Sequence, residues 1–287
     1  MHGLLLINKD EDYTSQDVCN VIKKIVQTKK VGHCGTLDPF AKGLMIVGIN
    51  QGTKVLSYLE KESKTYQASI TLGTATNTGD KTGKVIEKKE VNDYSISYLK
   101  EVLSHFLGKQ MQIPPMYSAI KINGKKLYEY ARKEVEVARK AREIEIYKID
   151  FIDYQKPVLT ISVTCSKGTY IRTLGEEIAK KLGTVGHVSE LIRTQIGSFL
   201  LQNAQSLAQL KENVHLFSIK EMLPFKQKIV NKALKKEILN GKKITYEGNE
   251  EMILLLDEEG KELAIYEKEE PSIYRCVRGF YYENIFN

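Results

Sequence analysis

Stretches with strand periodicity and stretches with helical periodicity follow one another irregularly along this chain, and this irregularity constrains the fold most. Alternating or continuous apolar residues predict strands at residues 4–8, 44–49, 66–72, 144–154 and 158–165. Apolar residues at helical spacing predict helices at residues 15–26, 97–107 and 170–182. Because no regular strand–helix–strand repeat links them, we predict an α+β fold with a mixed, mostly antiparallel central sheet flanked by helices.

Shorter signals refine this prediction. Ser15 is the expected N-cap of the first helix, and residues 31–42, rich in glycine and polar residues, are expected to form a loop. The pair Asn123-Gly124 is typical of a type I′ hairpin. Residues 84–88 are expected to return as a strand after a turn-rich segment.

The composition changes near residue 225. Residues 226–243 are dense in lysine, and two apolar runs then flank Asp257-Glu258-Glu259-Gly260, a hairpin pattern. A third strand is predicted at residues 274–280. We therefore expect a large domain at residues 1–225 and a small β-rich domain at residues 226–287.

The charge balance favours a polyanionic partner. Lys plus Arg number 43 against 36 Asp plus Glu, a formal net charge of +7. No run approaches the roughly 20 apolar residues of a membrane span, and the four cysteines form no Cys-x-x-Cys pair. These features predict a cytoplasmic protein with reduced thiols and no membrane association.

The sequence lacks the motifs of several familiar kinds of binding site and catalysis. The chain lacks a dinucleotide-binding Gly-x-Gly-x-x-Gly, a Gly-Lys-Ser/Thr phosphate loop and a His-Glu-x-x-His zinc motif. The five histidines are scattered without metal-ligand spacing. We therefore expect neither a cofactor nor a metal.

The most informative segment is GHCGTLDPFAKG, residues 32–43. Pro39 biases Asp38 toward an extended backbone, and Gly35 and Gly43 permit sharp bends or close approach of another chain. A carboxylate held on such a backbone suits catalysis. An Asp-Pro pair that merely initiates a turn is the competing interpretation, and these residues alone favour the turn.

This segment closely resembles motif II of the TruB family, the tRNA pseudouridine-55 synthases. Other motifs of that family follow the same order over roughly the first 200 residues. The matching segments are LLLINK (4–9), KTY (64–66), TNTGD (76–80), QIPPMYSAIK (112–121), CSKGTYIRTL (165–174) and LIRT (191–194). The pattern departs at Asp10, where proline is usual, and at Asn77, where aspartate is common.

The resemblance implies a pseudouridine synthase fold and a reaction without a cofactor. The N1–C1′ bond of a uridine breaks, the uracil turns, and it is rejoined through C5. Asp38 is implied to act as the nucleophile or as the base that starts cleavage. Arg172 is implied to pair with Asp38, and Tyr66 to stack on the base and move a proton at C5.

The resemblance also implies a tRNA substrate, contacted through its T-arm, with the T-loop uridine at position 55 flipped out of the loop. The implied substrate-binding residues are His33, Tyr170, Leu191, Lys9, Lys54 and Lys64. The small C-terminal domain resembles PUA-like RNA-binding domains. We expect a monomer.

Two other functions compete with this one. A non-catalytic RNA-binding protein on the same scaffold is disfavoured, because binding alone does not need a carboxylate facing polyanionic RNA. A metal-dependent nuclease needs clustered carboxylates for Mg²⁺, and the sequence shows no obvious partner acid for Asp38.

Overall fold

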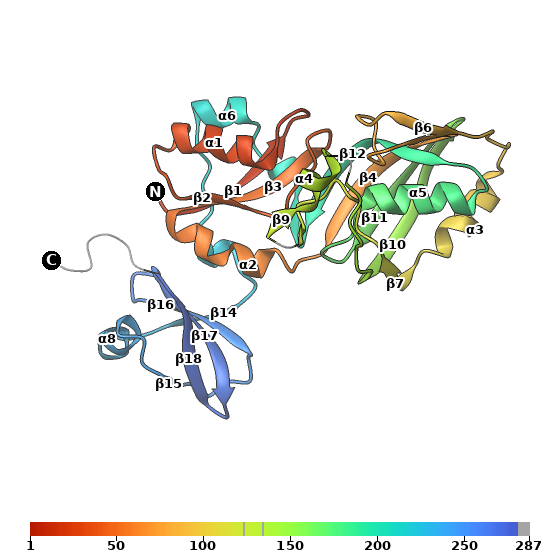
Figure 1. The fold of residues 1–287 in the computed structure, drawn as a ribbon. Coiled ribbons are helices and arrows are strands. Elements are labelled where there is room, and N and C mark those ends of the chain that lie inside the picture. Colours follow the sequence, from red (N-terminus) through yellow and green to blue (C-terminus); the bar gives the residue numbers. More distant parts are fainter. Residues whose placement is uncertain (123, 134, 281–287) are drawn as a thin grey trace.

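The computed structural model describes residues 1–122, 124–133 and 135–280. Asn123 of the predicted hairpin turn and the last seven residues of the predicted second domain lie outside this range. Figure 1 shows a large lobe built on one sheet and a smaller lobe, drawn in blue, built on another. The described fold confirms the predicted α+β class with a mixed central sheet.

The central sheet runs in the order β1-β3-β12-β4-β11-β10-β7, with β2 beside β3 and β13 beside β12. Its strands are β1 (Gly3–Lys9), β2 (Val31–Cys34), β3 (Lys42–Ile49), β4 (Lys64–Leu72), β7 (Gly108–Gln112), β10 (Arg142–Gln155), β11 (Val158–Cys165), β12 (Gly186–Ile196) and β13 (Phe199–Leu200). All its pairings are antiparallel except the contact between β12 and β3.

Two short hairpins accompany the sheet, and helices surround it. The hairpins are β5 (Thr74–Thr76) with β6 (Val85–Lys88), and β8 (Lys121–Ile122) with β9 (Lys125–Lys126). The helices are α1 (Ser15–Ile25), η1 (Asn50–Val55), α2 (Leu56–Leu59), α3 (Ile96–Ser104), α4 (Leu127–Ala131), α5 (Ile171–Lys181), η2 (Leu201–Asn203), α6 (Leu207–Glu212) and α7 (Ile219–Met222). The strand predicted at residues 84–88 and the hairpin predicted around Gly124 are therefore present.

Three local predictions need correction. The N-cap of α1 is Thr14, whose side chain accepts a hydrogen bond from the Asp17 backbone N–H, so Ser15 is the first helical residue. Residues 31–34 form β2 rather than loop, because they pair with β3. Strand β12 was not predicted, since register shifts near Val188 and Arg193 break its alternation.

Strand β12 is central to the site because it joins β3 to β4. It carries Leu191 and Arg193. It also brings the end of the segment at residues 32–43 alongside Tyr66, through the pairs Arg193↔Gly43 and Arg193↔Tyr66. Gly43 has φ +109°, and a Cβ there would lie 2.4 Å from the Arg193 carbonyl oxygen. Only glycine fits this close approach of two strands.

The second sheet runs in the order β14-β16-β17-β18-β15. Its elements are β14 (Lys226–Ile229), β15 (Ile244–Thr245), β16 (Met252–Leu256), β17 (Glu262–Glu270) and β18 (Ile273–Gly279), with helix α8 (Lys232–Leu239) beside it. Leu254 and Phe280 of this lobe share one apolar cluster with Leu4, Val55 and Met222 of the large lobe. The two lobes are thus joined by a buried apolar contact. No described helix is long and apolar enough to span a membrane.

Candidate active site

Asp38 and Arg172 form an ion pair at the centre of the large lobe. Arg172 Nε lies 2.8 Å from Asp38 Oδ2, and Nη2 donates to Oδ1 at 3.2 Å. The Arg172 side chain is 3% exposed, whereas that of Asp38 is 32% exposed. The carboxylate therefore rests on a buried guanidinium and keeps one side open to a substrate.

Arg172 is held by more than Asp38. It is the second residue of α5. Its Nη1 donates to the Thr78 carbonyl oxygen at 2.9 Å, and its Nη2 donates to that of Tyr117 at 2.7 Å. Nη1 also lies 3.4 Å from Asp80 Oδ2. Two carboxylates thus share one guanidinium, a geometry that fixes its plane.

Sequence reasoning missed Asp80 as a site residue. Its side chain is buried, and its Oδ1 accepts hydrogen bonds from Thr78 Oγ1, from Thr82 Oγ1 and from the Thr82 backbone N–H. It is therefore fixed before it meets Arg172. The signal was present, because Asp80 ends the TNTGD segment that was matched to the family without a role.

The catalytic segment is also a turn. The Ala41 backbone N–H donates to the Asp38 carbonyl oxygen at 3.1 Å. The ammonium of Lys9 donates to the carbonyl oxygens of Asp10, Tyr13 and Pro39. The two interpretations of Asp38-Pro39 are thus compatible, since the turn presents the carboxylate.

An apolar wall adjoins the carboxylate. Tyr66, Leu191 and Leu37 belong to the same buried cluster. Burial raises the pKa of the Tyr66 hydroxyl, and the nearby positive charge of Arg193 opposes this rise. Tyr66 is thus neutral in this site and can stack on a flat apolar ring.

The segment at the start of α5 carries Tyr170. The Tyr170 backbone N–H donates to Gln112 Oε1 at 2.8 Å, and Gln112 Nε2 donates back to the Tyr170 carbonyl oxygen at 3.2 Å. Burial raises the pKa of the Tyr170 hydroxyl, which lies near both Asp38 and Arg172. The structure therefore brings together Asp38, Arg172, Tyr66, Tyr170 and Leu191.

Arg193 is a second residue that sequence reasoning left without a role. It is fully buried, and it donates from Nε to the Leu44 carbonyl oxygen at 2.7 Å and from Nη2 to that of Gly35 at 3.2 Å. It thereby ties β12 to both ends of the catalytic segment. The available signal was its place in the LIRT segment at residues 191–194, which resembles a motif of the family.

The three lysines expected to contact RNA donate hydrogen bonds to backbone carbonyl oxygens. Lys9 is fully buried among backbone carbonyls, and Lys64 is buried with its Nζ donating to the carbonyl oxygens of Glu60 and Glu62. Lys54 donates to the Gly279 carbonyl oxygen at 2.7 Å, at the contact between the lobes. In this structure all three hold backbone segments in place, and their expected contact with RNA stays a prediction.

His33 lies on β2, within the segment at residues 32–43. Burial and the nearby Arg193 charge lower the pKa of its imidazole. Its Nδ1 is buried without a hydrogen-bond partner among the described residues. The expected contact of His33 with a flipped base stays a prediction.

The acidity of Asp38 follows from its surroundings. Burial raises the pKa of the Asp38 carboxyl and the nearby Asp80 carboxylate adds to the rise, while Arg172 and Lys9 oppose it. The ionised carboxylate is the form that can attack or accept a proton. Activity should therefore fall, as pH decreases, at a higher pH than for an exposed aspartate.

We predict that Asp80→Asn shifts the acid limb of the pH profile, where activity falls as pH decreases, to lower pH. Removing a neighbouring negative charge favours ionisation, so the pKa of Asp38 decreases. The measurement is the pH profile of kcat/KM, which reports the free enzyme. An unchanged acid limb, or one moved to higher pH, would contradict the coupling of Asp80 to Asp38.

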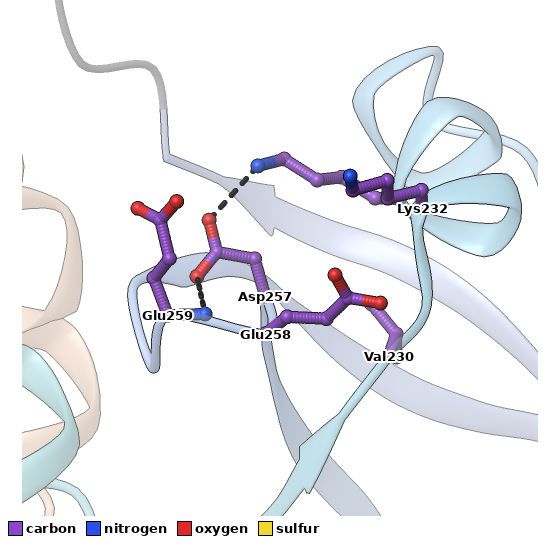
Figure 2. A pocket seen from close by; sticks show the side chains of 6 residues that line it. Val230, Lys232, Asp257, Glu258 and Glu259 are labelled. Carbon is purple, nitrogen blue, oxygen red and sulfur yellow. Dashed lines mark hydrogen bonds and ion pairs between the residues drawn. The ribbon is translucent and has the colours of Figure 1, made fainter.

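A small pocket on the second sheet lies apart from this site. Figure 2 shows Lys232, Asp257, Glu258 and Glu259 around it. The Asp257 carboxylate pairs with Lys235 Nζ at 2.9 Å and accepts from the backbone N–H groups of Glu259 and Lys261. The Asp257 carboxylate is therefore satisfied by Lys235 of α8 and by the backbone of its own turn, which indicates a structural role.

Known proteins share this architecture. A structure of an H/ACA RNP bound to a substrate RNA containing 2′-deoxyuridine superposes with a TM-score of 0.71 at 19% identity, covering 98% of this chain and 86% of that chain. At this identity the likeness shows the fold alone. The fold is that of the pseudouridine synthases.

Sequence comparisons are more specific. The model of the TruB family pseudouridylate synthase N-terminal domain matches residues 23–171, and that of the tRNA pseudouridylate synthase B C-terminal domain matches residues 172–233. The tRNA pseudouridine synthase B of Oceanobacillus iheyensis is 42% identical over 281 residues, covering 93% of each chain. That of Bacillus subtilis is 42% identical over 286 residues, also covering 93% of each. The chain belongs to the TruB family.

Proposed function

We propose that this protein is a tRNA pseudouridine synthase that isomerises the T-loop uridine at position 55. The observation that carries the proposal is the half-exposed Asp38 carboxylate resting on the buried Arg172, beside the wall of Tyr66 and Leu191, in a TruB family chain. Relatives about 40% identical over most of their length are named tRNA pseudouridine synthase B, which supports this activity.

The geometry supports a reaction carried by side chains. A uridine flipped out of its loop would place its ring on the apolar wall and its N1–C1′ bond against Asp38. The carboxylate then acts as nucleophile or as the base that starts cleavage. After the uracil has turned, Tyr66 is placed to take part in proton transfer at C5 before release of the product.

The position of Arg172 disfavours a metal-dependent nuclease. Asp38 does have a partner acid in space, namely Asp80, which corrects the expectation from sequence. The guanidinium lies between these two carboxylates, where a divalent cation would have to bind. No group of three potential metal ligands occurs among the residues that the structure describes.

The test is conversion of an unmodified tRNA transcript, followed by carbodiimide-block primer extension. Wild-type protein should produce a stop at T-loop position 55, and a transcript with cytidine there should give none. Conversion that persists undiminished in excess EDTA would agree with side-chain chemistry. No stop at any uridine would refute the proposed activity, and a stop elsewhere would refute the T-loop assignment.

We assign the contacts with RNA phosphates to exposed lysines on the rim of the site. Lys42 begins β3 near the end of the segment at residues 32–43, and Lys81 follows Asp80. Their side chains are 52% and 38% exposed, and both pair with Glu11. Because exposed ion pairs are worth only about 0–1 kcal/mol, RNA phosphates can replace Glu11 at these ammonium groups.

We predict that Lys42→Ala with Lys81→Ala weakens tRNA binding and lowers the slope of log K against log salt by about 1 per lost phosphate contact. Filter binding between low and moderate salt measures both quantities. The matched control is Lys109→Ala with Lys148→Ala, two exposed lysines of β7 and β10 that also pair with acids. An equal effect of the control pair, or no change in slope, would refute the assignment.

The second sheet is proposed to be a PUA-like RNA-binding domain, which would hold the T-arm from its acceptor-stem side. It begins at Lys226, and Lys226, Lys228, Lys232 and Lys236 lie on β14 and α8. Lysines of this number favour an RNA backbone as partner. We also propose that the protein is a cytoplasmic monomer, as expected from its sequence.

A further inference from the structure

A buried serine of α1 is bonded to the residue that precedes Asp38. Ser15 is 2% exposed. Its Oγ accepts a hydrogen bond from the Leu37 backbone N–H at 2.9 Å and donates one to the Leu37 carbonyl oxygen at 3.1 Å. A hydroxyl has one proton to donate and lone pairs to accept, so this one side chain satisfies both polar groups of Leu37.

These two bonds fix the backbone that carries the carboxylate. The Leu37 N–H belongs to the peptide plane before Leu37, and its carbonyl belongs to the plane that links Leu37 to Asp38. Fixing both planes leaves little freedom at the Asp38 Cα. On the other side, the Pro39 carbonyl oxygen accepts from the Asp12 backbone N–H at 2.9 Å and from Lys9 Nζ at 3.1 Å.

The rigidity matters because the ion pair is directional. Arg172 is already fixed by Asp80 and by two carbonyl oxygens. A carboxylate that moves relative to this fixed guanidinium loses its alignment with both Arg172 and the substrate. Misplacement by about 1 Å can cost roughly 10²-fold in rate.

We propose that Ser15 is a positioning residue, whose hydroxyl holds the Leu37 peptide planes so that the Asp38 carboxylate stays aligned on Arg172 and toward the substrate. This inference rests on the proposed function of Asp38. Ser15 is enclosed by protein and does not itself face the RNA. Its loss should therefore act on the chemical step and not on binding.

The test compares Ser15→Ala, Ser15→Cys and Ser15→Thr. Alanine removes both hydrogen bonds, and cysteine keeps the size of the side chain while replacing the hydroxyl by a weak donor and acceptor. Both should lower the single-turnover rate at saturating tRNA by about 10–10²-fold, with Kd for tRNA within about 2-fold. Threonine retains the hydroxyl and should restore most of the rate.

The matched control is Thr184→Ala. Thr184 is also buried, and its Oγ1 donates to the Glu90 carbonyl oxygen at 2.8 Å, beyond the end of α5 opposite Arg172. It should lower Tm without lowering the single-turnover rate of the folded protein. An equal rate loss in the control would show a general effect of destabilisation and overturn the proposal.

The outcomes separate this inference from the proposed function. If the wild type isomerises its tRNA and the folded alanine and cysteine variants keep the full rate, the positioning role is refuted and the function stands. A weaker Kd at an unchanged saturated rate would also refute it. If the wild type is inactive on tRNA, both proposals fall together.

Discussion

Replacing Asp38 by asparagine is expected to lower the rate of pseudouridine formation by on the order of 10⁴-fold or more, the range seen when a reacting side chain is removed from an enzyme. Asparagine has nearly the same size and can still meet Arg172, but it cannot carry the negative charge. The measurement is a time course of carbodiimide-block primer extension with excess enzyme. Binding of tRNA should change little, because the loss lies in the chemical step.

The control for this variant is Asp257→Asn. Asp257 is also a carboxylate in an ion pair, with Lys235 at 2.9 Å, but it lies in the turn that follows β16 of the second sheet (Figure 2). Losing it should lower stability and leave the rate near that of the wild type. If Asp38→Asn retains a rate within about 10-fold of the wild type, the carboxylate is not the reacting group.

Much of the central sheet could be predicted from period-two alternation, because one face of each strand packs against the core. Strands β4, β10 and β11 follow this logic, whereas helix α5 could be predicted from its helical spacing of apolar residues. Strand β12 escaped it, since two register shifts place Val188, Leu191 and Arg193 out of strict alternation. Strand β2 escaped because its glycine-rich sequence is typical of loops, and pairing with β3 overrides that preference.

Some residues of the site could be predicted from the sequence and others could not, for a physical reason. Asp38, Tyr66 and Arg172 lie in motifs that resemble the family, and the fold brings them together. Roles that depend on burial could not be predicted, since a sequence does not show whether a lysine is exposed: Lys9 and Lys64 are enclosed by carbonyl oxygens. Asp80 was missed because its importance arises only from its contact with Arg172.

The second large effect concerns Arg172. Arg172→Lys keeps a positive charge but cannot reproduce the fork that reaches Asp38, Asp80 and two carbonyl oxygens. We expect the single-turnover rate to fall by about 10²–10³-fold, comparable with removal of a preorganised electrostatic partner. Binding of tRNA, measured by filter retention, should stay within a few-fold. A lysine variant with the wild-type rate would show that the planar fork is not required.

Arg172→Ala should be more damaging to the protein than Arg172→Lys, because it leaves the carboxylates of Asp38 and Asp80 facing each other without a cation. Breaking a buried ion pair on one side costs about 3–5 kcal/mol, and the partial exposure of Asp38 places the expected loss of unfolding free energy at the lower end. The pKa of Asp38 should rise further, which moves the acid limb to higher pH, opposite to Asp80→Asn.

The double variant Arg172→Ala with Asp80→Asn separates stability from catalysis. Removing one carboxylate relieves the repulsion, so the free energy of unfolding should recover in part, as measured by denaturant titration. The rate should not recover, because Asp38 still lacks the guanidinium that orients it and favours its ionised form. If activity returned together with stability, Arg172 would be a structural residue, and the catalytic role of the ion pair would be lost.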